Sequence, residues 1–257
     1  MTAPKLKFTF LGTGSAFTVG EDNFHSNILI EDIATKSKLL FDCGSDARLS
    51  AHELGYSFKD IDSVYISHIH ADHTGGLEWL GFSRYFSECD VSDLYVSQDI
   101  VGPLWDSLAP GMSSLEDSKA TLDTFFNVHP INLKRRFVWK AYVFHLEYAK
   151  HVINNGIELP CYGLTLEIND KIVYVSSDTL NIYNENPELY KKADVIFHDC
   201  ETLPFKSGVH ANYTDLVKLP EEVKNKMWLY HYNPGPRPKP IKDGFKGFVQ
   251  KGQVFEF

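Results

Sequence analysis

Seven consecutive residues carry most of the information in this sequence: Ser67-His68-Ile69-His70-Ala71-Asp72-His73. They hold three imidazoles and one carboxylate, and they stand between a predicted strand over residues 63–67 and the tripeptide Thr74-Gly75-Gly76. Imidazole nitrogens and carboxylate oxygens are ligands for zinc and similar divalent cations. Alternation places His68 and His70 on one side of the chain, whereas Asp72 and His73 can turn to another. The spacing therefore favours two metal ions over one.

The bulk composition is that of an ordinary folded protein. The chain has 257 residues, of which 43% are hydrophobic and 23% are charged, and no apolar run approaches the length needed to cross a bilayer. The first eight residues lack the features of a signal peptide, and the four cysteines are scattered singly, so we expect a cytoplasmic protein without a membrane partner. The net charge of −9 argues against a long nucleic-acid partner. A small anion held by metal ions remains compatible with it.

Apolar runs of four to six residues predict strands, and apolar spacings of three and four residues predict helices. We expect strands over residues 6–11, 27–30, 38–41, 63–67, 141–146, 163–168, 171–175 and 195–198, and helices over 45–54 and 77–86. Asn169-Asp170 predicts a hairpin turn. Gly102-Pro103 and Pro110-Gly111 interrupt the region 98–130, which we interpret as a mobile loop or cap insertion. The chain is thus predicted to be a single α/β domain over residues 1–257.

The pattern His-x-His-x-Asp-His after a strand resembles the signature of the metallo-β-lactamase fold. Further parts of that signature follow in the expected order: Leu40-Phe41-Asp42-Cys43-Gly44, Tyr174-Val175-Ser176-Ser177-Asp178-Thr179 and Leu229-Tyr230-His231. The resemblance implies an αββα sandwich, in which two mixed β-sheets pack together and helices cover both outer faces.

The resemblance also implies a ligand set for two divalent cations. One cation would bind His68, His70 and His151, the other would bind Asp72, His73 and His231, and Asp178 would bridge them. In the family an intermediate histidine precedes the Tyr-Gly pair that matches Tyr162-Gly163. His151 fits this place best, although the interval is longer than in typical members, and His145 is the alternative. Asp42 would steady the metal-binding loop. No cysteine replaces Asp178, which argues against the classical antibiotic-degrading branch of the fold. His70 is not a glutamate, which argues against the flavo-diiron oxidoreductase branch, so the resemblance implies a hydrolase. Zinc is the expected metal, with manganese, iron and nickel as alternatives.

Two segments resemble the ribonuclease Z branch of this fold: Phe197-His198-Asp199-Cys200-Glu201 and Gly208-Val209-His210-Ala211. The resemblance implies that His210 donates a proton to the leaving group and that Asp199 orients it. Asp199 is one methylene shorter than the glutamate of that branch, so Glu201 is the alternative. We interpret His198 as a core histidine at the end of a strand. Asp72 is expected to serve both as a metal ligand and as a catalytic residue.

Several segments resemble the phage-encoded anti-Pycsar phosphodiesterases nearly end to end: residues 11–17, 75–78, 197–201 and 226–232. The resemblance implies a homodimeric enzyme of the host cytoplasm that hydrolyses cyclic mononucleotides (cCMP and cUMP, with cAMP and cGMP as further candidates) to 5′-monophosphates. One alternative is a ribonuclease Z-type endonuclease that processes tRNA 3′ ends and shares every metal ligand. The acidic charge argues against it, as does the lack of a lysine- and glycine-rich arm in residues 98–130. Another alternative is a non-catalytic sponge that sequesters a nucleotide, which the complete ligand set disfavours.

Overall fold

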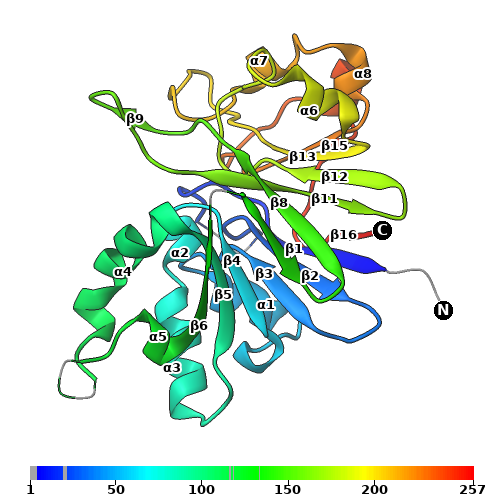
Figure 1. Cartoon of the computed structure of the whole chain (residues 1–257). Coiled ribbons are helices and arrows are strands. Elements are labelled where there is room, and N and C mark those ends of the chain that lie inside the picture. Colours follow the sequence, from blue (N-terminus) through cyan, green and yellow to red (C-terminus); the bar gives the residue numbers. More distant parts are fainter. Residues whose placement is uncertain (1–4, 20–21, 116, 118, 133) are drawn as a thin grey trace.

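A computed structural model of the chain describes residues 5–19, 22–115, 117, 119–132 and 134–257. Two seven-stranded sheets pack against each other, and helices lie on their outer faces (Figure 1). The first sheet contains, in spatial order, β16 (Val254–Glu256), β1 (Leu6–Gly12), β2 (Asn27–Asp32), β3 (Lys38–Phe41), β4 (Ser63–Ile66), β5 (Ser92–Ser97) and β6 (Phe126–Ile131). The second contains β15 (Gly247–Phe248), β14 (Met227–Tyr230), β13 (Val195–Asp199), β12 (Lys171–Val175), β11 (Tyr162–Ile168), β8 (Tyr142–Tyr148) and β7 (Arg136–Trp139).

The helices divide between the two sheets along the chain. Beside the first sheet lie α1 (Ala47–Glu53), α2 (Ala71–Thr74), α3 (Leu77–Phe86), α4 (Gln98–Met112) and α5 (Leu122–Phe125), and beside the second lie α6 (Pro187–Lys192), α7 (Tyr213–Leu216) and α8 (Glu221–Lys224) (Figure 1). Short 3₁₀ turns cover Phe58–Asp60 and Pro240–Asp243, and β9 (Ile153–Asn154) and β10 (Ile157–Glu158) form a separate hairpin. The expected αββα sandwich is therefore confirmed. No helix in the described part of the chain is long and apolar enough to cross a bilayer.

Each sheet mixes antiparallel and parallel pairs. Strands β3, β4, β5 and β6 are parallel in the first sheet, and β12, β13, β14 and β15 are parallel in the second. Parallel neighbours need a crossover connection, which the helices supply. Because all strands of a parallel group end at the same edge, segments far apart in the sequence meet there.

Aromatic side chains fill the space between the sheets. Phe197 of β13 lies 5.0 Å from Phe10 of β1 and 4.8 Å from Phe255 of β16, measured between ring centroids. Tyr65 of β4 stacks on Phe137 of β7 at 5.6 Å. These contacts join the two sheets and hold their strand ends in a fixed relation.

Most of the predicted elements match the structure. The predictions over residues 38–41, 77–86 and 171–175 agree at both ends, and the other predicted strands and the helix over residues 45–54 differ only at their ends. Asn169 and Asp170 have φ angles of 50° and 61° and connect the antiparallel strands β11 and β12, as expected for a tight hairpin turn.

The prediction of a loop or cap insertion over residues 98–130 is wrong. Helix α4 covers Gln98–Met112, and β6 joins the first sheet beside β5, so the region is an ordinary strand–helix–strand crossover. The buried residues of α4 recur every four positions: Ile100, Leu104, Leu108 and Met112. The glycines and prolines that suggested a loop are exposed. Burial of the apolar face outweighs the helix-breaking tendency of two prolines. Residues 116 and 118 lie outside the described part.

We expect the substitution Phe197→Ala to lower the free energy of unfolding by about 3–5 kcal/mol, because a fully buried ring between the sheets is lost and a cavity remains. Urea denaturation monitored by circular dichroism measures this change. Phe17 is 77% exposed, so Phe17→Ala serves as the matched control and should change stability by less than about 0.5 kcal/mol. Equal shifts of the two midpoints would contradict the packing described here.

Candidate metal centre

The candidate site lies where two parallel strands of the first sheet and three parallel strands of the second sheet end. Asp42 follows β3, residues 67–73 follow β4, Asp178 follows β12, Asp199 ends β13 and His231 follows β14. The histidine cluster thus comes from the first sheet and its partners come mostly from the second. Two further residues of the site, His151 and His210, lie on loops.

The structure brings all seven expected ligands together. Their donor atoms form two groups in which all atoms lie within 4.8 Å of one another, namely His68, His70, His151 and Asp178, and Asp72, His73, Asp178 and His231. Asp178 belongs to both groups. His145 does not take part, because it is exposed in the middle of β8, opposite Thr165 of β11.

The donor atoms are mostly buried, and some of them lack a hydrogen-bond partner. Six of the seven residues are buried, and His70 is half-buried. His73 Nε2 and Asp178 Oδ1 are buried without any hydrogen-bond partner, although His73 Nε2 lies 3.3 Å from both Asp72 Oδ2 and Asp178 Oδ2. Buried polar atoms are rarely left unpaired. The mixed nitrogen and oxygen donors therefore fit divalent metal ions.

Asp42 fixes the metal-binding loop. Its Oδ2 lies 2.7 Å from His73 Nδ1, and its two oxygens accept hydrogen bonds from the backbone N–H and the hydroxyl of Ser67, each at 2.8 Å. Burial raises the pKa of Asp42, and the contacts with His73 and Ser67 oppose that rise. Because Nδ1 of His73 is occupied, its Nε2 points into the cluster, which is how outer carboxylates usually orient metal-binding histidines.

Two other histidines are held through Nδ1 in the same way. His68 Nδ1 lies 3.0 Å from Ser67 Oγ, and His151 Nδ1 lies 2.8 Å from the carbonyl oxygen of Val209. Their Nε2 atoms face the cluster, 3.0 Å and 3.1 Å from His70 Nδ1. His231 Nδ1 lies 3.3 Å from Asp199 Oδ1, but neither atom has a hydrogen-bond partner. The Val209 contact could not be expected from the sequence, because a backbone carbonyl carries no residue-type signal.

The charges around Asp178 keep this carboxylate ionised. Burial alone would raise its pKa, but His231 and His73 lower the pKa of Asp178 well below its ordinary value. His68 shows the opposite case, since burial and then the nearby His73 lower its pKa well below the usual range. The Asp178 carboxylate in turn raises the pKa of His73 well above the usual range. Because metal binding requires neutral imidazoles, a cation bound at the cluster would take the place of that proton.

His210 lies beside the cluster with Asp199 as its partner. His210 Nδ1 is 2.8 Å from Asp199 Oδ2, which also accepts a hydrogen bond from the backbone N–H of Thr179 at 2.9 Å. Burial lowers the pKa of His210, but the Asp199 carboxylate outweighs this effect, so the pKa is raised overall. The carboxylate in contact with His210 is therefore that of Asp199 and not that of Glu201.

His198 is a core residue, as interpreted from the sequence. It is fully buried, its Nε2 lies 2.8 Å from the hydroxyl of Tyr190, and its Nδ1 lies 2.7 Å from the backbone carbonyl of Asp199. Both ring nitrogens are thus occupied within the protein.

The backbone around the site adopts uncommon conformations. Asp42, Ser177 and His231 have φ angles of 62°, 54° and 58°. Residues other than glycine seldom adopt this left-handed region. Gly44 packs against the metal-binding loop so closely that a Cβ there would lie 2.1 Å from the carbonyl oxygen of Asp72. Such strain persists only where the surrounding structure enforces it.

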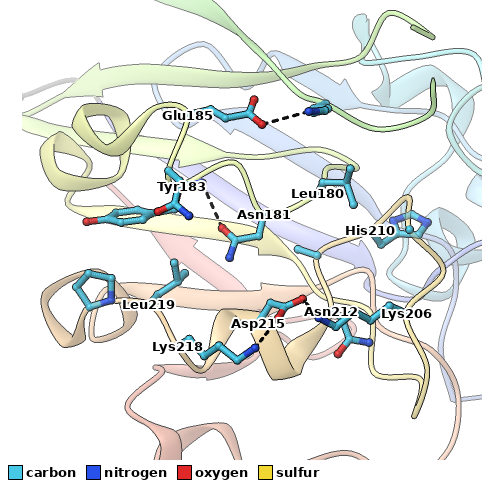
Figure 2. A pocket seen from close by; sticks show the side chains of 15 residues that line it. Leu180, Asn181, Tyr183, Glu185, Lys206, His210, Asn212, Asp215, Lys218 and Leu219 are labelled. Carbon is cyan, nitrogen blue, oxygen red and sulfur yellow. Dashed lines mark hydrogen bonds and ion pairs between the residues drawn. The ribbon is translucent and has the colours of Figure 1, made fainter. Parts of the chain in front are cut away.

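A pocket of about 630 Å³ opens beside His210. Figure 2 shows Leu180, Asn181 and Tyr183 on one side of it and the segment that carries Lys206, Asp215 and Lys218 on the other. Asp215 pairs with Lys206 at 2.5 Å and with Lys218 at 2.8 Å.

Comparison with known proteins agrees with this geometry. The family model described as anti-Pycsar protein Apyc1 matches residues 6–255. A protein of that name from Paenibacillus harenae is 35% identical over 228 residues, which cover 86% of this chain and 88% of the relative. Another from Bacillus phage vB_BveM-Goe7 is 31% identical over 260 residues, which cover 96% of each chain.

Solved structures show the same fold at low sequence identity. The metallo-β-lactamase fold protein YhfI from Bacillus subtilis superposes with a TM-score of 0.76 at 18% identity and covers 98% of this chain and 100% of its own. Human tRNase Z, short form, superposes with a TM-score of 0.68 at 16% identity and covers 97% of this chain and 98% of its own. These neighbours confirm the ribonuclease Z-like architecture. By the extent of the family match and its identity to the curated relatives, the chain belongs to the anti-Pycsar protein Apyc1 family.

Proposed function

We propose that the protein is a dinuclear metal-dependent phosphodiesterase that opens cyclic mononucleotides to 5′-monophosphates and acts against Pycsar defence in the host cytoplasm. The observation that carries this proposal is the arrangement of two donor groups that share Asp178, with the His210–Asp199 pair beside them. The family and the histidine–aspartate cluster support a metal-dependent hydrolase. The cyclic nucleotide, with cCMP and cUMP as first candidates, is the finer part of the proposal.

The first task of the chain is to hold the cations. His68, His70 and His151 would hold one, Asp72, His73 and His231 would hold the other, and Asp178 would be common to both. Two bound divalent cations would stabilise negative charge on the phosphate oxygens and acidify a water molecule. Asp42 and the Val209 carbonyl keep two of the imidazoles in the orientation that this requires.

The second task is to supply a proton to the departing sugar oxygen. Asp199 occupies Nδ1 of His210 and leaves Nε2 as the atom that can donate. The raised pKa of His210 favours the protonated imidazole that a general acid needs. Asp199 Oδ1 also lies 3.3 Å from His231 Nδ1, so the same carboxylate lies close to both the proposed proton donor and a proposed metal ligand.

The pocket beside His210 supports a small substrate. Its volume of about 630 Å³ falls within the range of about 300–1,000 Å³ that is usual for small-molecule sites. We propose that the nucleoside part of the substrate lies there, between Asn181 and Lys206 (Figure 2).

Processing of tRNA 3′ ends is the alternative function, because the metal ligands are compatible with it. The net charge of −9 disfavours a long RNA, and residues 98–112 form a packed helix rather than an extended arm. A nucleotide-sequestering sponge is disfavoured by the complete set of ligands. Homodimer formation stays a prediction, which sedimentation velocity would test.

The substrate class is tested by incubating the protein with cCMP, cUMP, cAMP, cGMP and an unprocessed tRNA. We expect ring opening of the cyclic nucleotides, detected by chromatography, and loss of that activity in His70→Ala, because one donor group then lacks a ligand. Cleavage of the tRNA alone would replace our proposal with the processing function. Retention of intact nucleotide would indicate a sponge.

Substitution of the proton donor should separate catalysis from metal binding. We expect His210→Ala to reduce turnover of a cyclic nucleotide by about 10²–10⁴-fold, the usual contribution of a general acid, and to keep its metal content. Asp178→Ala should lose both the activity and the bound metal, as measured by kinetics and by elemental analysis. His145→Ala is the control, since His145 is exposed on β8 and should affect neither. Loss of metal in His210→Ala would place that residue among the ligands instead.

Removal of metal should destabilise the fold. When the free cation concentration is 100 times the dissociation constant, binding stabilises the folded state by about 2.7 kcal/mol. A chelator should therefore lower the melting temperature, which differential scanning calorimetry measures. Asp178→Ala, which cannot share a carboxylate between two cations, should show a much smaller response. An equal response of the two proteins would count against metal binding at this cluster.

A further inference from the structure

A loop beside the metal centre carries two of the groups that the proposed reaction needs. This loop, residues 202–211, is named the His210 loop and connects β13 to α7. The Val209 carbonyl accepts a hydrogen bond from His151 Nδ1 at 2.8 Å, and His210 lies 2.8 Å from Asp199. The positions of a metal ligand and of the proton donor therefore both depend on what holds this loop.

Glu201 holds the inside of the His210 loop. Its side chain is buried, with 2% exposure, and both carboxylate oxygens lie 3.1 Å from the backbone nitrogen of Ser207. Oε2 also accepts a hydrogen bond from Asn212 Nδ2 at 3.0 Å. The same Asn212 nitrogen donates to the carbonyls of Leu203 and Phe205, each at 3.2 Å. Glu201 and Asn212 thus fasten the loop at three points along its backbone.

Backbone hydrogen bonds close the neck of the loop. The Glu201 N–H donates to the carbonyl of Ala211 and the Tyr213 N–H donates to the carbonyl of Glu201, both at 2.9 Å, while the Ala211 N–H donates to Thr179 at 2.7 Å. Inside the loop, Ser207 Oγ accepts a hydrogen bond from the Val209 N–H at 3.3 Å. The hydrogen bonds of Glu201 to Ser207, together with the bond from Val209 to Ser207, therefore also restrict Val209 and the adjacent His210.

We propose that Glu201 is a positioning residue, which sets His210 and the Val209 carbonyl against the metal centre by holding the His210 loop. An ionised carboxylate is a stronger acceptor for a backbone N–H than a neutral group is. Without it, the Ser207 N–H loses both of its acceptor oxygens, Asn212 keeps only the carbonyls of Leu203 and Phe205, and the loop regains conformational freedom. Asp199 orients the ring of His210, whereas Glu201 places the backbone that carries it. The proposal rests on the proposed function, because a proton donor matters only if the leaving group needs a proton.

The test compares two phosphodiesters at saturating zinc. Cyclic CMP needs a proton on its departing sugar oxygen, whereas bis(p-nitrophenyl) phosphate releases a nitrophenolate that does not. We expect Glu201→Ala to lower kcat for cyclic CMP by about 10–100-fold, as is usual when a supporting residue is lost. The rate with bis(p-nitrophenyl) phosphate should change less than about threefold, because general-acid catalysis does not contribute to it.

Direct titration with zinc gives a second readout that does not depend on activity. Because the Val209 carbonyl orients His151, we expect Glu201→Ala to weaken zinc binding by about tenfold in isothermal titration calorimetry. Glu201→Gln keeps one oxygen for the Ser207 N–H and should recover part of the cyclic CMP rate. It also replaces the alanine variant if that variant does not fold.

Glu31→Ala is the matched control. Glu31 is a buried carboxylate of β2 with 7% exposure, and it pairs with Lys7 at 2.6 Å, away from the His210 loop. Both variants lose a buried carboxylate and both can lower the melting temperature. We expect only Glu201→Ala to separate the two substrates and to weaken zinc binding, which a loss of stability alone does not do.

Two results would overturn the proposal: equal loss of activity towards both substrates, or no loss with either. A wild-type protein that hydrolyses bis(p-nitrophenyl) phosphate but not cyclic nucleotides would instead disprove the proposed substrate. In that case, or if neither ester is hydrolysed, the zinc titration decides, and unchanged zinc binding in Glu201→Ala would reject the positioning role.

Discussion

The buried carboxylate of Asp178 is the point on which the two halves of the molecule converge. Its Oδ2 lies 3.3 Å from Nε2 of His73, which lies in α2 after strand β4 of the first sheet. Its Oδ1 lies 3.3 Å from Nε2 of His231, which follows strand β14 of the second sheet. A buried charge is tolerated only where it is paired or coordinates a metal. The relation between the sheets is therefore constrained both by the aromatic core and by the need to compensate this charge.

Strand ends meet this constraint better than long loops would. Asp42, Ser177 and His231 follow strands whose cores are buried, and each adopts a left-handed backbone conformation. Such conformations cost about 1–3 kcal/mol each, and the paired strands on which they are mounted supply the stability that offsets this cost. Together, the paired strands and the strained residues at their ends restrict the positions of the donor atoms more than either feature would alone.

The sequence predicted the parts of this site that depend on residue type and spacing. The heptapeptide from Ser67 to His73 indicated metal ligands because imidazoles and carboxylates are the groups that bind such ions. The preference for His151 over His145 agrees with the predicted strand over residues 141–146, because His145 lies inside β8 and His151 follows it. The helix at Gln98–Met112 was missed because prolines and glycines dominated the local pattern, while its buried face is set by tertiary packing. The carbonyl of Val209 and the loop contacts of Glu201 have no signature in the sequence.

The expected metal ligands lie mostly at strand ends, whereas the features that can select a substrate lie on loops. The ligands alone therefore do not identify the substrate. The metal-binding residues at the strand ends are compatible with more than one phosphodiesterase reaction, since a fold does not by itself determine function. Substrate choice usually depends on connecting loops, and here the His210 loop, which carries the proposed proton donor, and the pocket beside it are such features. A loop that must hold an imidazole at a fixed place without a regular helix or strand needs an internal support. The buried Glu201 carboxylate, with its bonds to Ser207 and Asn212, has the contacts that such a support requires.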